Sequence, residues 1–392
     1  MGDLLNSKIW FVKPRLICGV MTGTSLDSID IAFVKFENNN RGEHSFNLVA
    51  GREYKFPVKY RNHVLKLINK KNRIADYSLF QVAYSNLIAE AIKTLIKEFE
   101  IKDKIDAISV HGQTLWHEPK KENLFNFDLS HTYQSVSGTT LSSILEIPVV
   151  YDFRANDIAL GGNGAPLIPI FDYHFLKDVS TDVIALNIGG ISNLTYIPKQ
   201  ANDEKITGFD TGPGNMLIDL AVNQFFGKKY DKDGEIAKSG NVKIELFNYL
   251  LNDTFFKTPP PKSTGREKFN DEYFNKIIEY KEELKISNED FVSTLCNFTA
   301  KTISDAINNF ISTNAKIYIS GGGRKNTELV RQLKKYLSNH EIQMIDTIGI
   351  NGDLKEAIGF AYIAWRSIGG MYGNLPSATG ARRKVRLGAI SL

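Results

Sequence analysis

Short apolar runs that end in glycine turns recur along this chain. Residues 183–188 are apolar and end in Gly189 and Gly190, and a second run, 191–197, follows at once. Two short runs joined by glycines, which readily adopt positive φ, predict a tight β-hairpin. A further short run leads into the word DTGPGN at 210–215, so we expect another strand that ends at this polar turn.

The same pattern occurs near the start of the chain. Residues 16–20 are apolar, the polar turn MTGTSLDS follows, and residues 29–36 alternate between apolar and polar like a strand. A third glycine turn, SGGGR at 320–324, follows the short strand-like run 316–319. Two hairpins about half the chain apart, with a later glycine turn, predict an α/β fold that resembles the two-lobed, actin-like fold of sugar kinases, actin and heat-shock ATPases.

Helical periodicity fills much of the space between these runs. Apolar residues recur at spacings of three and four over 59–69, 75–99, 216–226, 291–310 and 354–365. The apolar stripe that we predict for the second of these helices consists of Leu79, Val82, Ala83, Leu87, Ile88, Ala91, Ile92, Leu95 and Ile96.

Length and charge limit the possible architectures and partners. A chain of 392 residues is too long for one typical core, so we expect lobes at 1–178 and 179–392, with the C-terminal helix packing back at their boundary. Hydrophobic residues make up 42% and charged residues 23%, as in ordinary globular proteins. The net charge is only +4 and forms no concentrated block, which predicts no nucleic-acid partner.

The apolar runs, the first residues and the two cysteines together predict a cytoplasmic protein. No run of about 18 apolar residues is present, so no membrane span is expected. The first residues lack the apolar core and small-residue cleavage site of a signal peptide. Cys18 and Cys296 are isolated in apolar surroundings, which is typical of buried thiols in a reducing compartment.

The word DTGPGN offers the first candidate chemistry. Asp210 between a strand and a glycine turn suits a catalytic base beside a phosphate, because glycines let the backbone N–H groups approach anionic oxygens. An Asx-turn that caps the helix starting near 216 fits the word about as well; the second hairpin favours the phosphate interpretation. The predicted nucleotide-binding residues of this half are Gly189, Gly190, Thr211, Gly212, Gly214 and Asn215.

No GxxxxGK[ST] motif is present, so a Walker-type nucleotide site is excluded. We expect the phosphates of ATP to bind between the two hairpins through backbone N–H groups and the hydroxyls of Thr24, Ser25 and Thr211. Mg²⁺ would shield the phosphates, with no direct protein ligand assigned. The adenine and ribose would lie against a turn consisting of Gly321, Gly322 and Gly323, followed by Arg324.

Polar residues at the ends of two further predicted strands are candidates for substrate binding. His111 follows the run 105–110, and Arg154 follows the run 147–151. Ligands of open α/β sheets bind at the carboxyl ends of strands, so His111, Arg154, Asp157 and Gly164 of the GGNGAP loop are predicted to contact a polar substrate. Alternatively, His111 bonds nearby backbone and an Arg–Asp pair pins the loop; a guanidinium can do both.

Several longer words match one family in its own order, from about residue 16 to 381. They are GVMTGTSLDSIDIAFV, HGQTLWHEP, IPVVYDFRANDIALGGNGAPLIP, LNIGGISNLT, GFDTGPGNMLID, YDKDGEIAKSG, PPKSTGREKF, YISGGGRKN, EAIGFAYIA and NLPSATGA. The chain resembles the anhydro-N-acetylmuramic acid kinases.

This resemblance implies a double reaction in which water opens the 1,6-anhydro bridge and the freed O6 takes the γ-phosphoryl group of ATP. The product is N-acetylmuramic acid 6-phosphate, formed during cell-wall recycling. Asp210 matches the base that activates the water, and Glu356 matches an acidic position near the sugar. The family's ATP-binding segment matches Gly23, Thr24, Ser25, Leu26, Asp27, Ser28, Ile29 and Asp30.

One segment departs from the family pattern. Where relatives carry a QIGDP-like or QIGNG-like word, this chain has YQSVSGTT at 133–140, which keeps a glycine at Gly138. Alternatives are therefore a kinase for another sugar on the same fold, or a non-catalytic actin-like nucleotide switch. A homodimer is possible.

Overall fold

The structure is a computed structural model that describes residues 7–23, 26, 28–39, 42–57, 59–69, 71–260, 262–265, 268–311 and 313–392. The chain forms two compact units: unit 1 contains Met1–Phe175 and Leu354–Leu392, and unit 2 contains Leu176–Asp353. The predicted C-terminal lobe, 179–392, is therefore wrong beyond residue 353. The last segment belongs to unit 1 because its helix packs on the first sheet and its final strand pairs there.

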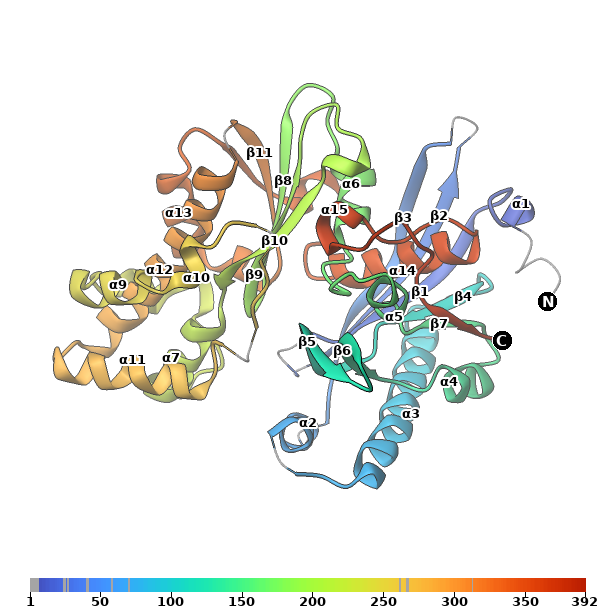
Figure 1. Cartoon of the computed structure of the whole chain (residues 1–392), viewed down its shortest axis with the longest axis horizontal. Helices are drawn as coiled ribbons and strands as arrows, with labels where there is room; N and C mark the ends of the chain where they lie inside the picture. The colour runs from blue at the N-terminus through green and yellow to red at the C-terminus, as the bar shows by residue number, and fades with distance from the viewer. Residues whose placement is uncertain are drawn as a thin grey trace. The chain divides into compact units, whose positions relative to one another are not determined.

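Unit 1 is built on a six-stranded sheet (Figure 1). Its order is β13-β7-β4-β1-β2-β3. The hairpin of β1 and β2 is antiparallel, β3 continues it, and β4 and β7 run parallel to β1. The strands are β1 (Arg15–Met21), β2 (Ser28–Asn38), β3 (His44–Lys55), β4 (Ala107–Val110), β7 (Val149–Tyr151) and β13 (Ala389–Ser391).

Both faces of β1 are covered, which explains why its sequence is almost continuously apolar. Leu16, Cys18 and Val20 pack in one core with α3 (Ile74–Glu98). On the opposite face, a Cβ at Gly19 would lie 2.1 Å from the carbonyl oxygen of Ala357 in α14 (Lys355–Ile368). The remaining helices of unit 1 are α1 (Ser7–Trp10), α2 (Tyr60–Asn69), α4 (Gly138–Leu145), α5 (Ala155–Ala159), α15 (Pro376–Thr379) and most of α6 (Pro169–Leu176).

Unit 2 repeats this strand order. Its five-stranded sheet runs β10-β9-β8-β11-β12, with β8, β9 and β10 antiparallel and β11 and β12 parallel to β8. The shared order confirms the predicted duplication of a hairpin-led α/β unit. The strands are β8 (Asp182–Ile188), β9 (Ile191–Ile197), β10 (Thr207–Pro213), β11 (Ala315–Ser320) and β12 (Glu341–Met344).

Helices enclose a large apolar core in unit 2, and most of these helices are drawn in yellow and orange in Figure 1. The central helix is α12 (Asn288–Phe310), and it packs against α7, α8, α9, α13 and β10. The helices around it are α7 (Met216–Phe226), α8 (Glu235–Ser239), α9 (Ile244–Leu251), α10 (Thr254–Lys257), α11 (Asp271–Glu283) and α13 (Thr327–Tyr336). Short 3-10 turns are η1 (Asp203–Lys205), η2 (Lys232–Gly234), η3 (Gly322–Lys325) and η4 (Ile345–Ile348).

Two features of unit 1 differ from the sequence prediction. The helix α3 is present, but Leu79 and Val82 of its predicted stripe are 70% and 45% exposed. Phe80 and Tyr84 take the buried face there because their rings pack with Tyr60. A two-stranded ribbon, β5 (Gln113–Leu124) and β6 (Phe127–Ser135), had not been predicted (Figure 1).

Among the helices of the described ranges, none has the length and apolar character required to cross a membrane.

Candidate active site

Glycine turns of unit 2 meet at the carboxyl ends of its strands. The hairpin turn at Gly189 and Gly190 follows β8. The strand β10 continues through Pro213, so the expectation that it would end at the DTGPGN word is wrong, and only Gly214 and Asn215 follow it. The N–H of Gly214 donates to the carbonyl of Gly190 at 2.8 Å, and that of Asn215 donates to Gly189 at 2.8 Å. The helix α7 starts at once, so its N-terminal turn lies against the hairpin.

Close backbone approach explains why these positions are glycines. A Cβ at Gly214 would lie 2.3 Å from the carbonyl oxygen of Gly189. A Cβ at Gly321, which has φ +79°, would lie 2.6 Å from the carbonyl oxygen of Ile188. The third glycine turn therefore packs directly on the end of β8, and the three words predicted to bind nucleotide share one edge of the unit 2 sheet.

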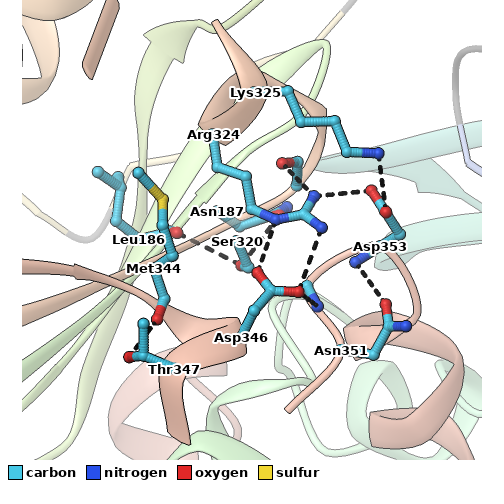
Figure 2. Close-up of polar contacts among 12 residues, drawn as sticks. Leu186, Asn187, Ser320, Arg324, Lys325, Met344, Asp346, Thr347, Asn351 and Asp353 are labelled. Atoms are coloured by element: carbon cyan, nitrogen blue, oxygen red, sulfur yellow. Dashed lines mark hydrogen bonds and ion pairs between the residues drawn. The ribbon is translucent and has the colours of Figure 1, made fainter. Parts of the chain in front are cut away.

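Arg324 ties the third turn to the segment that follows β12 (Figure 2). Its guanidinium donates to Asp346 at 2.8 Å, to Asp353 at 2.7 Å and to the carbonyl of Gly321 at 3.1 Å. The hydrogen bond to Asp353 raises the pKa of Arg324, and the same bond holds the pKa of Asp353 at about 2. Arg324 therefore braces the turn, and its placement against adenine and ribose stays a prediction.

Asp210 lies one residue before an irregularity in the pairing of β10 with β9 and is partly exposed. Its Oδ2 accepts hydrogen bonds from the hydroxyl of Ser263 at 2.8 Å and the N–H of Thr264 at 2.9 Å. Its own N–H donates to the carbonyl of Lys262 at 3.1 Å. The hydrogen bonds from Ser263 and Thr264 thus reach the carboxylate from a distant segment. The Asx-turn alternative is not supported, because Asn215, at the N-cap of α7, makes no side-chain capping bond.

Other side chains of the DTGPGN word face the protein. Thr211 is 1% exposed, and its hydroxyl donates to the carbonyl of Ser192 at 3.2 Å. The predicted contact of this hydroxyl with phosphate is thus wrong for this structure, since the group is buried between β10 and β9. At Gly212, with φ +133°, a Cβ would meet the ring of Phe256 at 2.7 Å.

The hairpin of unit 1 is described only in part. Thr24, Ser25 and Asp27, all predicted nucleotide ligands, lie outside the described residues. Leu26 is 3% exposed and Ile29 is completely buried, so their side chains pack in the core. Any contact of these two with a nucleotide would use backbone atoms. The predicted residues that keep partial exposure are Gly23, Ser28 and Asp30.

His111 and Arg154 form one polar unit. His111 is 2% exposed; its Nδ1 lies 2.9 Å from the carbonyl of Gly112, and its Nε2 lies 3.1 Å from Nε of Arg154. A carbonyl only accepts, so Nδ1 carries the hydrogen and Nε2 accepts from Arg154. Burial and the charge of Arg154 lower the pKa of His111 well below its ordinary value, which keeps the ring neutral. Direct substrate contact by His111 is not supported; it orients Arg154.

Asp157 joins two loops of unit 1 inside the protein. It is fully buried, and its Oδ2 accepts from the N–H of Gly164 at 2.9 Å. Its Oδ1 accepts from Asn374 at 2.7 Å and from the hydroxyl of Thr379 at 2.7 Å. The predicted contact of Asp157 with substrate is replaced by a structural role, because both oxygens bond protein groups. Gly164, with φ +68°, is likewise buried, and its carbonyl accepts from Arg154 at 3.3 Å.

Glu356 lies in the first turn of α14 and is partly exposed. Burial raises the pKa of Glu356, while the charges of Lys355 and Arg154 act in the opposite direction. Lys355 forms a buried ion pair with Asp172 of α6 at 2.7 Å, which anchors the start of the helix. Unit 1 therefore brings Glu356 into electrostatic range of Arg154, as expected if both face a common polar ligand.

Sequence reasoning missed the segment that holds Asp210. Lys262, Ser263 and Thr264 bond Asp210, and no site residue had been predicted in this segment. The sequence offered only the KSTG motif within PPKSTGREKF as a sign that this segment has a function. Hydrophobic periodicity is local and could not show that the segment contacts Asp210, more than fifty positions earlier.

A family model for anhydro-N-acetylmuramic acid kinase matches residues 15–392, which is nearly the whole chain. The chain belongs to the anhydro-N-acetylmuramic acid kinase family. Membership makes it a kinase with a small sugar substrate, and the expected two-lobed fold of sugar kinases, actin and heat-shock ATPases agrees with the repeated sheet order.

Solved structures with similar folds share little sequence with this kinase. The activator of 2-hydroxyisocaproyl-CoA dehydratase from Clostridium difficile, with bound ADPNP, is 10% identical, with 90% of this chain and 96% of that chain covered and a TM-score of 0.45. Component A of (R)-2-hydroxyglutaryl-CoA dehydratase from Acidaminococcus fermentans is 9% identical, with 90% and 99% covered and a TM-score of 0.46. A ROK family glucokinase from Streptomyces griseus, in complex with glucose and AMPPNP, is 12% identical, with 88% and 97% covered and a TM-score of 0.37.

Proposed function

We propose that this kinase uses ATP to open 1,6-anhydro-N-acetylmuramic acid hydrolytically and to phosphorylate it to N-acetylmuramic acid 6-phosphate, a step of cell-wall recycling. The observation that carries the proposal is Asp210, a carboxylate of β10 that two donors orient, just before the irregularity that leads into the glycine turn. Family membership supplies the substrate class.

The turns of unit 2 fit the phosphates of ATP because their backbones meet without side chains in the way. We assign the phosphates to the hairpin turn at Gly189 and Gly190, against which Gly214 packs, and the nucleoside to the turn at Gly321. Among the described residues no group of three His, Cys, Asp or Glu could hold a metal ion. Mg²⁺ would therefore be bound chiefly through phosphate oxygens.

In the proposed reaction Asp210 takes a proton from water as the water oxygen attacks the anomeric carbon. The bond from that carbon to O6 breaks, O6 bonds to the γ-phosphorus of ATP, and ADP leaves. The protonated Asp210 then returns its proton to solvent. Arg154, oriented by His111, and Glu356 are the unit 1 residues that we assign to the sugar, with Asp157 and Gly164 shaping the loop beside them.

Product analysis tests the proposal. The protein is incubated with ATP, Mg²⁺ and the anhydro sugar, and the product is examined by mass spectrometry and phosphorus NMR. We expect a mass increase of one water and one phosphoryl group, with the phosphorus coupled to the protons on carbon 6. Phosphorylation without addition of water would contradict the ring-opening step.

Parallel assays with ordinary hexoses test the alternative that the kinase phosphorylates a different sugar. This alternative arises because residues 133–140 differ from the family pattern. In that segment Ser137 caps α4 by accepting from the N–H of Thr140 at 3.2 Å. Faster turnover of a hexose would assign the site to that sugar, and slow ATP turnover independent of any sugar would favour a nucleotide switch.

A further inference from the structure

The segment at residues 262–264 runs beside the middle of β10 and bonds Asp210 at both backbone and side chain. Asp210 donates its N–H to the carbonyl of Lys262 at 3.1 Å, while its Oδ2 accepts from the hydroxyl of Ser263 at 2.8 Å and from the N–H of Thr264 at 2.9 Å. Two donors on one oxygen restrict rotation of the carboxylate, so its second oxygen points in a defined direction.

Lys262 anchors this segment in the core of unit 2. Its Nζ donates to the carbonyl of Phe255 at 3.0 Å and lies over the rings of Phe255 and Phe310, 4.7 Å and 5.3 Å from their centroids. Burial lowers the pKa of Lys262, and the charge of Asp210 opposes that change. Because the lysine is only 9% exposed, the residues that follow it are attached to a rigid point.

The same chain contains a second example of this arrangement away from the site. Asp178 accepts from the hydroxyl of Ser180 at 2.6 Å and from its N–H at 2.8 Å. These two bonds, together with Lys316, hold the pKa of Asp178 below its ordinary value. Hydroxyl and amide donors on one carboxylate oxygen therefore favour the charged form, which is the form that a general base requires.

We propose that Ser263 is a positioning residue that keeps Asp210 ionised and aims it at the attacking water. The inference rests on the proposed role of Asp210 as the base. The competing explanation is that the hydroxyl only secures the segment to the strand. The two differ in their effect on the pH dependence, because a purely structural bond would alter stability without moving the ionisation of the base.

The test compares Ser263→Ala and Ser263→Thr with Ser180→Ala, which removes the matched hydroxyl outside the proposed machinery. We measure kcat and KM for the anhydro sugar between pH 4 and 8, KM for ATP, and Tm. For Ser263→Ala we expect the acid limb of kcat to move up by about one pH unit. We also expect kcat to fall by up to about tenfold at pH values below the acid limb of the unmodified protein, with KM for ATP within about twofold of the unmodified value.

Ser263→Thr keeps a hydroxyl and should restore the acid limb, and Ser180→Ala should match the unmodified protein. An unchanged acid limb in Ser263→Ala, with only a lower Tm, would overturn the proposal. Carbon-13 NMR of labelled aspartate carboxyls, with the Asp210 signal assigned by its loss in Asp210→Asn, follows the same ionisation without turnover. If the unmodified protein does not phosphorylate the sugar, the proposed function fails, and this titration still decides whether Ser263 controls Asp210.

Discussion

The two units use their candidate residues in different ways. In unit 2 the glycine turns meet through backbone contacts, and Asp210 is oriented beside them by a segment from elsewhere in the unit. In unit 1 most predicted polar ligands bond one another: His111 holds Arg154, and Asp157 is enclosed by loop donors. A polar residue in these segments can thus contact the substrate, or it can hold another residue that does. The buried candidates belong to the second group.

Burial divides the candidates clearly. Asp210, Arg154 and Glu356 are partly exposed, whereas His111, Asp157 and Thr211 are almost completely buried with protein partners. A side chain whose donors and acceptors are all bonded to protein groups has none left to bind a substrate. We therefore expect substitutions in the first set to affect rate or binding, and those in the second set to affect stability first.

The largest effect is expected for Asp210→Asn. The amide keeps the size of the side chain but cannot accept a proton at neutral pH, so kcat for the sugar should fall by about 10³-fold or more. ATP affinity, measured by calorimetry, should stay within about threefold because the glycine turns are unchanged. Activity near that of the unmodified protein would remove Asp210 from the role of base.

Gly214→Ala tests the backbone contacts of unit 2. The new Cβ would lie 2.3 Å from the carbonyl oxygen of Gly189, so the two turns must separate. We expect the free energy of unfolding in urea to fall by about 3 kcal/mol and ATP binding to weaken. Gly322→Ala is the stability control, because its Cβ would meet only the side-chain nitrogen of Asn215, at 3.8 Å. Equal stability of the two variants would contradict the close packing.

The sequence predicted the parts of the fold that local patterns encode. The run 183–197, with glycines at its centre, predicted the hairpin of β8 and β9, whose second strand begins and ends where expected. The ribbon of β5 and β6 was not predicted. Its alternating residues Phe127 and Leu129 are 64% and 46% exposed, so the alternation does not mark a buried face of the kind on which strand prediction depends.

Long-range partners limited the prediction of the site. Glycine clusters indicated where backbone segments approach one another closely, as Gly214 and Gly321 do with the end of β8 and its turn. The role of Asp157 depends on Asn374 and Thr379, which are 217 and 222 positions away, and that of Asp210 depends on Ser263, 53 positions away. No local pattern shows whether a carboxylate will meet such donors or remain available to a substrate.

Asp157→Asn tests the structural assignment in unit 1. An amide has a single accepting oxygen, so either Gly164 or the pair Asn374 and Thr379 loses its acceptor inside the protein. We expect the free energy of unfolding to fall by about 2 kcal/mol. At a temperature where the variant is folded, KM for the sugar should change by less than about threefold. A large rise in KM at unchanged stability would instead restore Asp157 to substrate contact.

His117→Gln tests the electrostatic influence of Arg154. His117, next to its strand partner Thr132 on the ribbon, has a pKa lowered by burial and by the charge of Arg154 to about 4, against about 6.5 when unfolded. Below pH 6.5 the unfolded chain binds a proton that the folded protein does not, so this histidine makes folding less stable as the pH falls toward 4. Removing it should reduce the stability loss between pH 7 and pH 5 by about 1–2 kcal/mol, measured by urea unfolding at both values. The hydroxyl of Thr132 donates to the carbonyl of Trp116 at 3.1 Å, so Nδ1 of His117, 3.1 Å from that hydroxyl, is the donor. The amide of glutamine can still donate there, so the difference between the two pH values isolates the proton. Equal losses in both proteins would mean that folding does not lower the pKa of His117, and the prediction would be wrong.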